Sequence, residues 1–160
     1  MLDGPSVVAA LKECGVTHAV WIPDTELGKW EPALAGAPEL SLIRVCREGE
    51  AIAIAAGLLL GGKRPMVLIQ CTGLFEAGDA LRNCVHDLHL PLFFVIGVRS
   101  WYDHQAGTST DTCPIFTEPI VQAWQIPYVL LTNNHTAADL AAAYRQAQAE
   151  ARAGAVLLAE

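Results

Sequence analysis

Two carboxylates, Glu48 and Glu50, lie where the sequence changes from a strand-like pattern to an apolar helical one. Residues 40–45 have the alternation and β-branching of a strand, and the Ala/Ile/Leu-rich segment that follows to Leu60 is apolar on all sides, as in a buried helix. Ligands of open α/β sheets bind outside the carboxyl ends of the strands, so an acid at this junction would point into a crevice. The structural alternative is that an acid in the first helical turn only stabilises the helix dipole.

Other candidate side chains follow three further apolar runs. They are Asp24 and Thr25 after residues 18–22, Thr72 and Gly73 after residues 66–69, and Arg99 after residues 91–96. An arginine at the carboxyl end of a strand is a candidate for binding an anionic substrate tail, and Lys29 and Arg47 are weaker candidates. Structural alternatives exist for the others, because Pro-Asp is a common turn and Thr is a common helix N-cap.

Histidine is the remaining residue type that could transfer protons. His104 lies in the long stretch 99–114, which is rich in Ser, Thr, Asp and Gly. Long loops in compact domains are usually functional, although an exposed histidine without a role is an equal alternative. His86 and His89 are three residues apart on an expected helix, but no third ligand has matching spacing, so we expect a surface pair and no metal site in this chain.

Strands and helices alternate along the chain. The expected helices are an N-terminal one between Asp3 as N-cap and Gly15, then 26–34, 48–60, 72–88, 115–125 and 136–152 with Gly154 as its stop; the expected strands are 18–22, 40–45, 66–69, 91–96, 128–131 and 155–158. This order predicts an α/β fold, a single three-layer domain with a mostly parallel sheet of about six strands, helices on both faces and right-handed crossovers.

Composition limits the class of protein. The chain has 160 residues, which suits one domain over 1–160 and is too short for two catalytic domains. Hydrophobic residues make up 52% and the mean hydropathy is +0.33, so part of the apolar surface should be buried against other subunits. The net charge is −7 with 10 Lys and Arg and no basic cluster, which argues against nucleic acid or an anionic membrane as a partner.

Location can also be predicted from the sequence. Charged residues interrupt every long apolar run and the first residues do not begin a signal peptide, so we expect neither a membrane span nor secretion. The five cysteines are odd in number and contain no Cys-x-x-Cys pair, which favours reduced thiols over a disulfide framework or a zinc site. These features predict a cytoplasmic protein.

Three motifs resemble the pyrimidine-binding (PYR) domain of thiamin-diphosphate-dependent decarboxylases. In that family a strand is followed by Glu, a small residue and an Ala-rich helix containing Gly, positions held here by Glu48 and Gly57. Residues 21–25, Trp-Ile-Pro-Asp-Thr, are similar to the Val-Pro-Asp-Ser turn of phosphonopyruvate and sulfopyruvate decarboxylases, and residues 69–74, Ile-Gln-Cys-Thr-Gly-Leu, are similar to their Gln-Asn-Ser-Gly-Leu turn. Each motif alone is weak, but as a set they are specific.

The resemblance implies roles for several residues. Glu48, rather than Glu50, would contact ring nitrogen N1′ of thiamin diphosphate, and the turn Thr72-Gly73-Leu74 would approach the aminopyrimidine. Asp24 and Thr25 would lie within reach of the substrate. Many of these decarboxylases carry a histidine in the loop that contains His104, where it handles protons or the substrate carboxylate. The chain departs from its relatives at residues 75 and 76, where Phe and Glu replace Gly and Asn.

The resemblance also implies a partner. These enzymes bind the diphosphate through Mg²⁺ on a Gly-Asp-Gly motif from a second domain, and this sequence contains no such motif. The expectation is therefore the alpha (PYR) subunit of a hetero-oligomer whose beta (PP-domain) subunit holds Mg²⁺ and shares thiamin diphosphate. Its substrate would be a small anionic 2-oxoacid, with 3-sulfopyruvate converted into sulfoacetaldehyde and CO₂. The alternatives are phosphonopyruvate, another 2-oxoacid, or a non-catalytic α/β binding or regulatory module.

Overall fold

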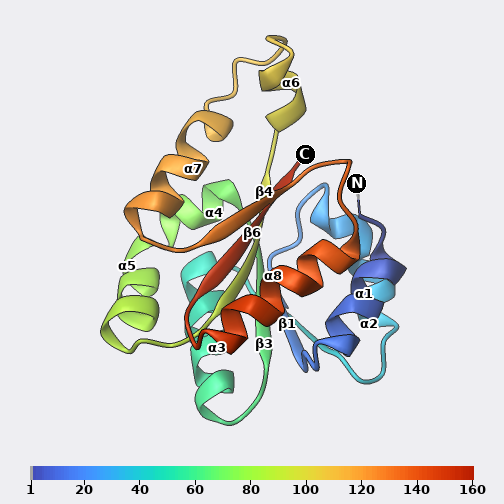
Figure 1. The fold of residues 1–160 in the computed structure, drawn as a ribbon, viewed down its shortest axis with the longest axis vertical. Coiled ribbons are helices and arrows are strands. Elements are labelled where there is room, and N and C mark those ends of the chain that lie inside the picture. Colours follow the sequence, from blue (N-terminus) through green and yellow to red (C-terminus); the bar gives the residue numbers. More distant parts are fainter. Residues whose placement is uncertain (1) are drawn as a thin grey trace.

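The computed structural model describes residues 2–160, in which six strands form one sheet (Figure 1). The strands are β1 (His18–Trp21), β2 (Ser41–Arg44), β3 (Pro65–Gln70), β4 (Phe93–Val98), β5 (Tyr128–Leu131) and β6 (Gly154–Ala159). They are arranged in the order β2-β1-β3-β4-β6-β5, and every neighbouring pair is parallel. The predicted α/β fold is confirmed, and the sheet is wholly rather than mostly parallel.

The first helix precedes β1, and the others lie between consecutive strands. They are α1 (Gly4–Glu13), the 3₁₀ turn η1 (Leu27–Trp30), α2 (Glu31–Ala35), α3 (Glu48–Leu60), α4 (Cys71–Glu76), α5 (Gly78–Leu81), the π-helical turn η2 (Arg82–Asp87), α6 (Trp101–Gln105), α7 (Cys113–Ala123) and α8 (Ala137–Ala149). In Figure 1, α1, α2 and α8 lie on one side of the sheet and α3, α5 and α7 on the other. The sheet is therefore the middle of three layers.

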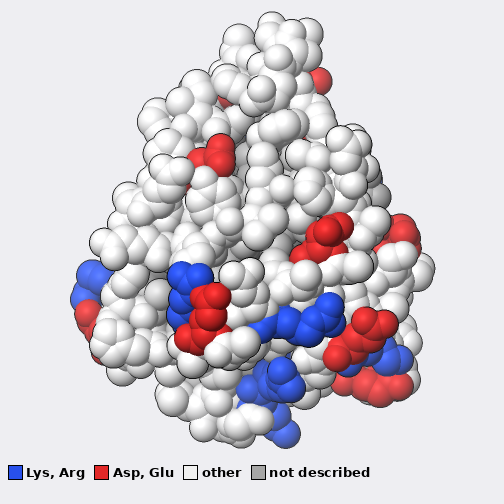
Figure 2. All heavy atoms as spheres, viewed as in Figure 1, with Lys and Arg blue, Asp and Glu red and all other residues white. Residues whose placement is uncertain are grey.

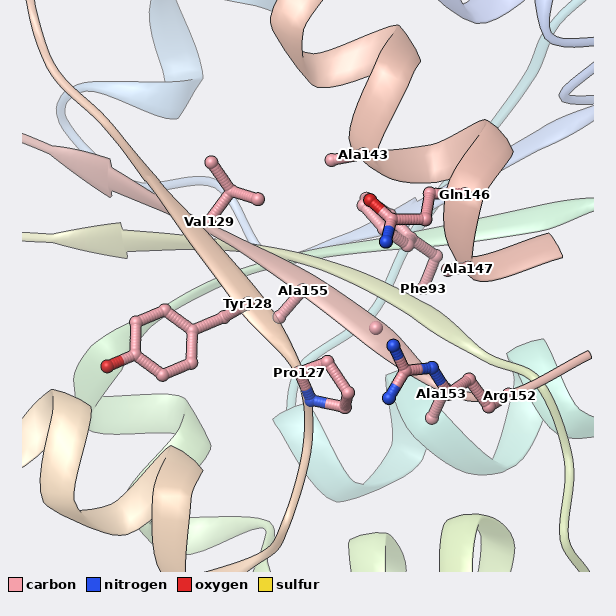
Figure 3. A pocket seen from close by; sticks show the side chains of 11 residues that line it. Phe93, Pro127, Tyr128, Val129, Ala143, Gln146, Ala147, Arg152, Ala153 and Ala155 are labelled. Atoms are coloured by element: carbon pink, nitrogen blue, oxygen red, sulfur yellow. The ribbon is translucent and has the colours of Figure 1, made fainter. Parts of the chain in front are cut away.

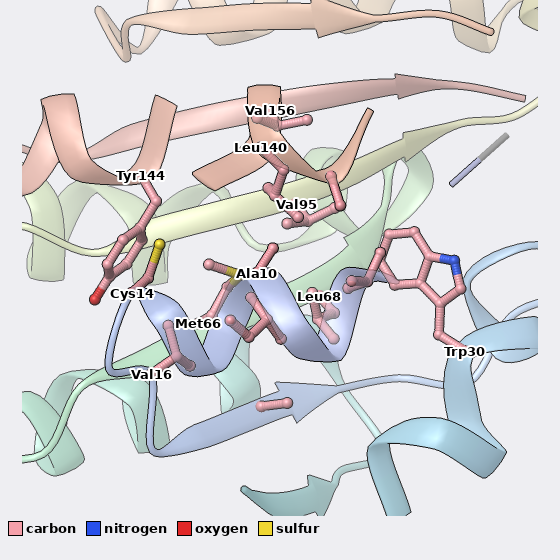
Figure 4. Packing of buried hydrophobic residues seen from close by; sticks show 14 of the residues in the cluster. Ala10, Cys14, Val16, Trp30, Met66, Leu68, Val95, Leu140, Tyr144 and Val156 are labelled. Atoms are coloured by element: carbon pink, nitrogen blue, oxygen red, sulfur yellow. The ribbon is translucent and has the colours of Figure 1, made fainter. Parts of the chain in front are cut away.

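Each face of the sheet packs against its own apolar core. On the side of α1 and α8, Met66, Leu68 and Val95 of the sheet contact a cluster that includes Trp30 and Tyr144 (Figure 4). The other face packs against α3, α4, η2 and α7. All six residues of β4 and all six of β6 are buried, as expected for central strands of a parallel sheet covered on both sides.

Local capping determines where two of the helices begin. The Asp3 side chain accepts a 2.9 Å hydrogen bond from the Ser6 amide, which confirms it as the N-cap of α1. Gly15, just after α1, has φ +69°, a left-handed conformation that glycine adopts readily. A capping box between Thr136 and Asp139 begins α8, as the predicted N-cap requires. That helix ends at Ala149 instead of 152, and the expected stop residue Gly154 begins β6.

Three expected elements differ from the structure. The predicted helix 72–88 is divided into α4, α5 and η2, with a break at Ala77, where ψ is 12°. A Cβ on Gly78 would lie 3.2 Å from the Trp124 ring, so the chain bends where it packs closely against the end of α7. The predicted helix 26–34 is η1 followed by α2. The stretch 99–114, expected to be irregular, contains the short helix α6.

The remaining features agree with the composition. All five cysteines are free; Cys14, Cys71, Cys84 and Cys113 are buried and Cys46 is exposed. None of the helices within residues 2–160 has the length and apolar character needed to cross a membrane. On the face shown in Figure 2, basic and acidic side chains lie beside one another over the lower half, and the upper half near α6 and α7 carries few charges.

Candidate active site at the carboxyl edge of the sheet

Glu48 is the first residue of α3, which begins after the end of β2. The preceding residue, Arg47, is extended, with φ −143° and ψ 143°, so the chain turns sharply from strand to helix at this point. The Glu48 side chain is half-buried. No residue in the described range 2–160 forms a hydrogen bond or an ion pair with its carboxyl group. Glu48 therefore presents an open acid at the carboxyl edge of the sheet, as the junction of strand and helix predicts.

Gly73 lies directly against this carboxyl group. A Cβ atom on Gly73 would be 2.0 Å from Cγ of Glu48 and 2.4 Å from both Cδ and Oε1. Any side chain at position 73 would therefore occupy the space that the Glu48 carboxyl fills. The structure brings together the two residues that the family motifs single out, from the starts of α3 and α4.

Glu50 has a different environment, although it is only two residues away. Its side chain is exposed, and its Oε2 atom accepts a 3.2 Å hydrogen bond from the backbone N–H of Cys46. This contact satisfies a backbone donor just before α3, which is the structural role of an acid near a helix start. Of the two carboxylates, only Glu50 forms such a contact with the backbone before the helix within the described residues.

The turn after β3 places its residues in three environments. Thr72 is exposed, and its hydroxyl donates a 3.1 Å hydrogen bond to Oε1 of Gln70. Leu74 is 0% exposed and lies in the core, so only its backbone could face a ligand. Glu76, one of the departures from the family pattern, forms a 2.8 Å ion pair with Arg47 and joins α4 to the start of α3.

A cleft of about 330 Å³ opens at the same edge of the sheet. Its lining residues come from the ends of β1, β3, β4 and β6: Thr25, Glu26, Gln70, Arg99, Ser100, Asp103 and Glu160. Two predicted substrate-binding residues, Thr25 and Arg99, therefore meet in one cleft. A volume of this size is at the lower end of the range for small-molecule sites, about 300–1,000 Å³.

The Arg99 side chain is held in position by Asp111. Its Nε atom donates a 2.8 Å hydrogen bond to Oδ2 of Asp111, which also accepts one from the Ser100 hydroxyl. The backbone N–H of Cys113 donates to the other Asp111 oxygen at 2.9 Å. These donors, the Cys113 amide first, lower the pKa of Asp111 to about 2. The guanidinium is half-exposed, so its remaining N–H groups can face an anion in the cleft.

Asp24 performs the structural role that its turn sequence suggests and retains one free oxygen. Its Oδ1 atom accepts 2.8 Å hydrogen bonds from the backbone N–H groups of Glu26 and Leu27. Its Oδ2 atom is buried without a hydrogen-bond partner among the residues that the structure describes. Burial is the main cause of the raised pKa of Asp24, and the backbone donors oppose it.

None of the three predicted histidines lines the cleft at the carboxyl edge. His104 lies on α6, and although its neighbour Asp103 lines the cleft, His104 itself does not. His86 stacks on the Trp124 ring at a centroid distance of 5.9 Å, and together with His89 it lines a hollow near the opposite edge of the sheet. Within residues 2–160, no three His, Cys, Asp or Glu side chains are grouped to hold a metal ion.

The opposite edge of the sheet offers smaller hollows. One of about 100 Å³ lies between α8 and the first residues of β5 and β6; Figure 3 shows Tyr128 and Val129 on one side of it and Gln146 on the other. The hollow at His86 measures about 270 Å³. Both are smaller than the cleft at the carboxyl edge, which also lies where open α/β sheets bind their ligands.

Sequence reasoning missed two features of the cleft. Glu160 follows the buried strand β6, and Asp111 lies in the stretch expected to be irregular. A polar residue at the end of an apolar run was the signal that identified Asp24, and the same signal could have identified Glu160. No sequence signal marks Asp111, because its partner Arg99 is twelve residues away and the chain folds back between them.

Comparison with protein families shows which family the chain is part of. Residues 4–116 match the family described as "Thiamine pyrophosphate enzyme, N-terminal TPP binding domain". The chain belongs to this family. The match includes Glu48, Gly73 and Arg99, and thiamin pyrophosphate is another name for thiamin diphosphate, so the predicted resemblance is confirmed.

Two curated relatives of this chain are decarboxylases. The chain is 28% identical over 94 residues to sulfopyruvate decarboxylase subunit alpha of Methanothermobacter thermautotrophicus, covering 59% of this chain and 57% of the relative. It is 31% identical over 101 residues to phosphonopyruvate decarboxylase of Streptomyces viridochromogenes, covering 63% of this chain and 25% of the relative. This thiamin pyrophosphate domain is thus homologous to decarboxylases. The match covers less than two thirds of the length of either relative.

Solved structures support the fold alone. Benzoylformate decarboxylase of Polynucleobacter necessarius superposes with a TM-score of 0.71 at 18% identity, over 99% of this chain and 30% of that one. A 4-hydroxybenzoylformate decarboxylase of Rhodococcus jostii superposes with a TM-score of 0.67 at 20% identity, over 98% of this chain and 29% of that one.

Proposed function

We propose that this domain is the pyrimidine-binding part of a thiamin-diphosphate-dependent 2-oxoacid decarboxylase similar to sulfopyruvate decarboxylase, acting on 3-sulfopyruvate to give sulfoacetaldehyde and CO₂. The observation that carries the proposal is the contact of the open Glu48 carboxyl with Gly73 at the carboxyl edge of the sheet. The names of the relatives, among them two alpha subunits of sulfopyruvate decarboxylase, support the reaction and the substrate.

The residues at this edge fit the aminopyrimidine end of the cofactor. When bound, thiamin diphosphate supplies a nucleophilic carbon that its own aminopyrimidine helps to form. Glu48 would hold a proton at ring nitrogen N1′, since its carboxyl is half-buried and has no competing partner in the described chain. Gly73 has no side chain, so its backbone could approach the ring beside this carboxyl. Thr72 and the backbone of Leu74 would complete this wall.

The cleft lined by Thr25 and Arg99 would bind the substrate. Arg99 keeps part of its guanidinium exposed while Asp111 orients it, which suits binding of a sulfonate or carboxylate. Asp24 lies beside this cleft in sequence, and its free Oδ2 would face the substrate side. For His104, on α6, we propose a role in handling protons or the substrate carboxylate.

A second domain or subunit would supply the rest of the site. The sequence contains no Gly-Asp-Gly motif, so we assign Mg²⁺ and the diphosphate to a beta (PP-domain) subunit in a hetero-oligomer. Exposed apolar side chains support association, among them Ile115 and Phe116 of α7, each 51% exposed. The five free thiols favour the cytoplasm as the location of this complex.

The test is to purify the chain with its native partner and to measure CO₂ release from 3-sulfopyruvate, phosphonopyruvate, pyruvate and benzoylformate. We expect 3-sulfopyruvate to give the highest kcat/KM, and the chain without the partner to give no turnover. Robust turnover by the chain alone would refute the shared site. A complex that binds no thiamin diphosphate and decarboxylates none of the four acids would refute the enzyme and favour a non-catalytic binding module.

A further inference from the structure

The cleft contains an acidic side chain whose environment is unlike that of any other carboxylate at this edge. Both carboxyl oxygens of Glu160 are buried, and neither has a hydrogen-bond partner among the described residues. Leaving a buried polar group unpaired is costly, so such groups are rare unless a ligand or a change of protonation compensates. Glu160 is therefore the feature of the cleft that most needs a functional explanation.

The backbone holds Glu160 in this place. Its N–H donates to the carbonyl of Val98 at 3.2 Å, and its own carbonyl accepts from the N–H of Tyr102 at 3.2 Å. These bonds extend the pairing of β4 with β6 and tie the residue to the start of α6. Because both the N–H and the carbonyl oxygen of Glu160 are paired, the direction of its side chain is determined by the sheet.

Gly97 provides the space that the carboxyl group occupies. A Cβ on Gly97 would lie 2.3 Å from Oε1 of Glu160 and 2.9 Å from its Cδ. The arrangement repeats the contact of Glu48 with Gly73, on the opposite face of the sheet edge. Two glutamate side chains thus lie over two glycines, one in α4 just after β3 and one near the end of the neighbouring strand β4, and only one of these pairs belongs to a family motif.

The charges around Glu160 favour its neutral form. Burial raises the pKa of Glu160 to about 8, helped by the nearby carboxylates of Asp24 and Glu26 and opposed by the ammonium group of Lys29. Glu26 forms an ion pair with Lys29, which reduces the help that this cation could give to an ionised Glu160. A neutral carboxyl group can donate a hydrogen bond, whereas a carboxylate can only accept one.

We propose that Glu160 is a substrate-binding residue that donates a hydrogen bond from its protonated carboxyl group to an anionic group of the 2-oxoacid, in the cleft that Arg99 also lines. This inference rests on the proposed function and deepens it. It accounts for an acid in a site for anions, since a neutral donor attracts a sulfonate or carboxylate that an ionised glutamate would repel. It also makes anion binding depend on pH, because loss of the proton removes the donor and adds a like charge.

The titration of Glu160 can be followed directly by ¹³C NMR of side-chain carboxyl groups in the full chain, with E160Q used to assign the signal. We expect a midpoint near the pKa of about 8, against 4.5 for an ordinary glutamate. G97A should push the carboxyl out of its place and move the midpoint toward 4.5. G57A is the matched control, because no atom lies within 4 Å of a Cβ at that position, and it should leave the Glu160 midpoint unchanged.

Anion binding is then tested with sulfoacetate, which carries a sulfonate and a carboxylate but has no ketone to react. If sulfoacetate binds only the protonated form, a concentration ten times its Kd should raise the Glu160 midpoint by about one pH unit. In E160Q, sulfoacetate binding should be nearly independent of pH between 6 and 9. A wild-type midpoint near 4.5, or a midpoint that sulfoacetate does not move, would overturn the inference.

The outcome is separable from that of the proposed function. A chain whose Glu160 responds to sulfoacetate, but whose complex decarboxylates no 2-oxoacid, would refute the reaction and leave the anion site intact. Decarboxylation by a complex in which Glu160 titrates as an ordinary glutamate would refute the role of Glu160 alone.

Discussion

The contact of Gly73 with Glu48 makes a sharp prediction for the substitution G73A. The added methyl carbon would lie 2.0 Å from Cγ of Glu48, whereas ordinary van der Waals contact begins at 3.4 Å, so Cγ must move by about 1.4 Å and shift the attached carboxyl group. Misplacing a reacting group by about 1 Å can cost roughly 10²-fold in rate. We therefore expect G73A to slow C2-proton exchange of bound thiamin diphosphate by about 10²-fold in the assembled complex.

The same substitution should also affect stability. Forcing a methyl group into a filled space typically costs about 1–3 kcal/mol, which urea unfolding of the isolated chain can measure. G57A is the control, since Gly57 is exposed in the middle of α3 with no atom within 4 Å of its would-be Cβ. Replacing a glycine by alanine there should stabilise the helix by up to about 1 kcal/mol.

A double-mutant cycle separates the contact from other effects of the new methyl group. E48A removes the three atoms that the methyl group would strike, so G73A should cost little stability in that background. The coupling energy should lie in the range of about 1–3 kcal/mol expected of residues in direct contact. Wild-type exchange in G73A, or an equal loss of stability with and without the Glu48 side chain, would refute the assigned geometry.

Three other perturbations follow from the charges at this edge. E48Q should lower the rate of C2-proton exchange by about 10²-fold or more while E50Q leaves it nearly unchanged, and the reverse result would show that the wrong carboxylate was chosen. The pKa of Glu160 is raised from 4.5 to about 8, so the unfolded chain loses this proton at lower pH than the folded chain does. The urea midpoint of unfolding should therefore fall as pH rises from 4.5 to 8 and then level off. E160Q should reduce this slope, and an equal slope in both proteins would contradict the raised pKa. The pKa of Asp111 is lowered from 3.8 to about 2, so its contribution to stability should be present above pH 3.8 and lost as pH falls toward 2. Acid unfolding of D111N should lack this loss. An acid profile equal to that of the wild type would show that the contacts of Asp111 with Arg99 and Cys113 contribute nothing to stability.

Helix ends, which depend on residues close together in the chain, were predictable from the sequence. Asp3, Gly15 and Thr136 mark helix ends because capping and left-handed turns depend on residues only a few positions apart. The alternation of strands and helices predicted a parallel sheet, and with it the edge at which Glu48 had to lie. The choice of Glu48 over Glu50 came from a family motif and stays a prediction; in the structure Glu50 accepts a hydrogen bond from the backbone N–H of Cys46.

Contacts between distant segments were decided only by the tertiary structure. The break in the expected helix 72–88 lies where Gly78 packs closely against Trp124 at the end of α7, and the periodicity of one segment does not register such a distant contact. The buried position of Glu160 likewise depends on Gly97 of the neighbouring strand β4 and on charged groups that follow β1. Burial and electrostatic energy are properties of the space around a side chain, and in a parallel sheet that space is formed by residues far apart in the sequence.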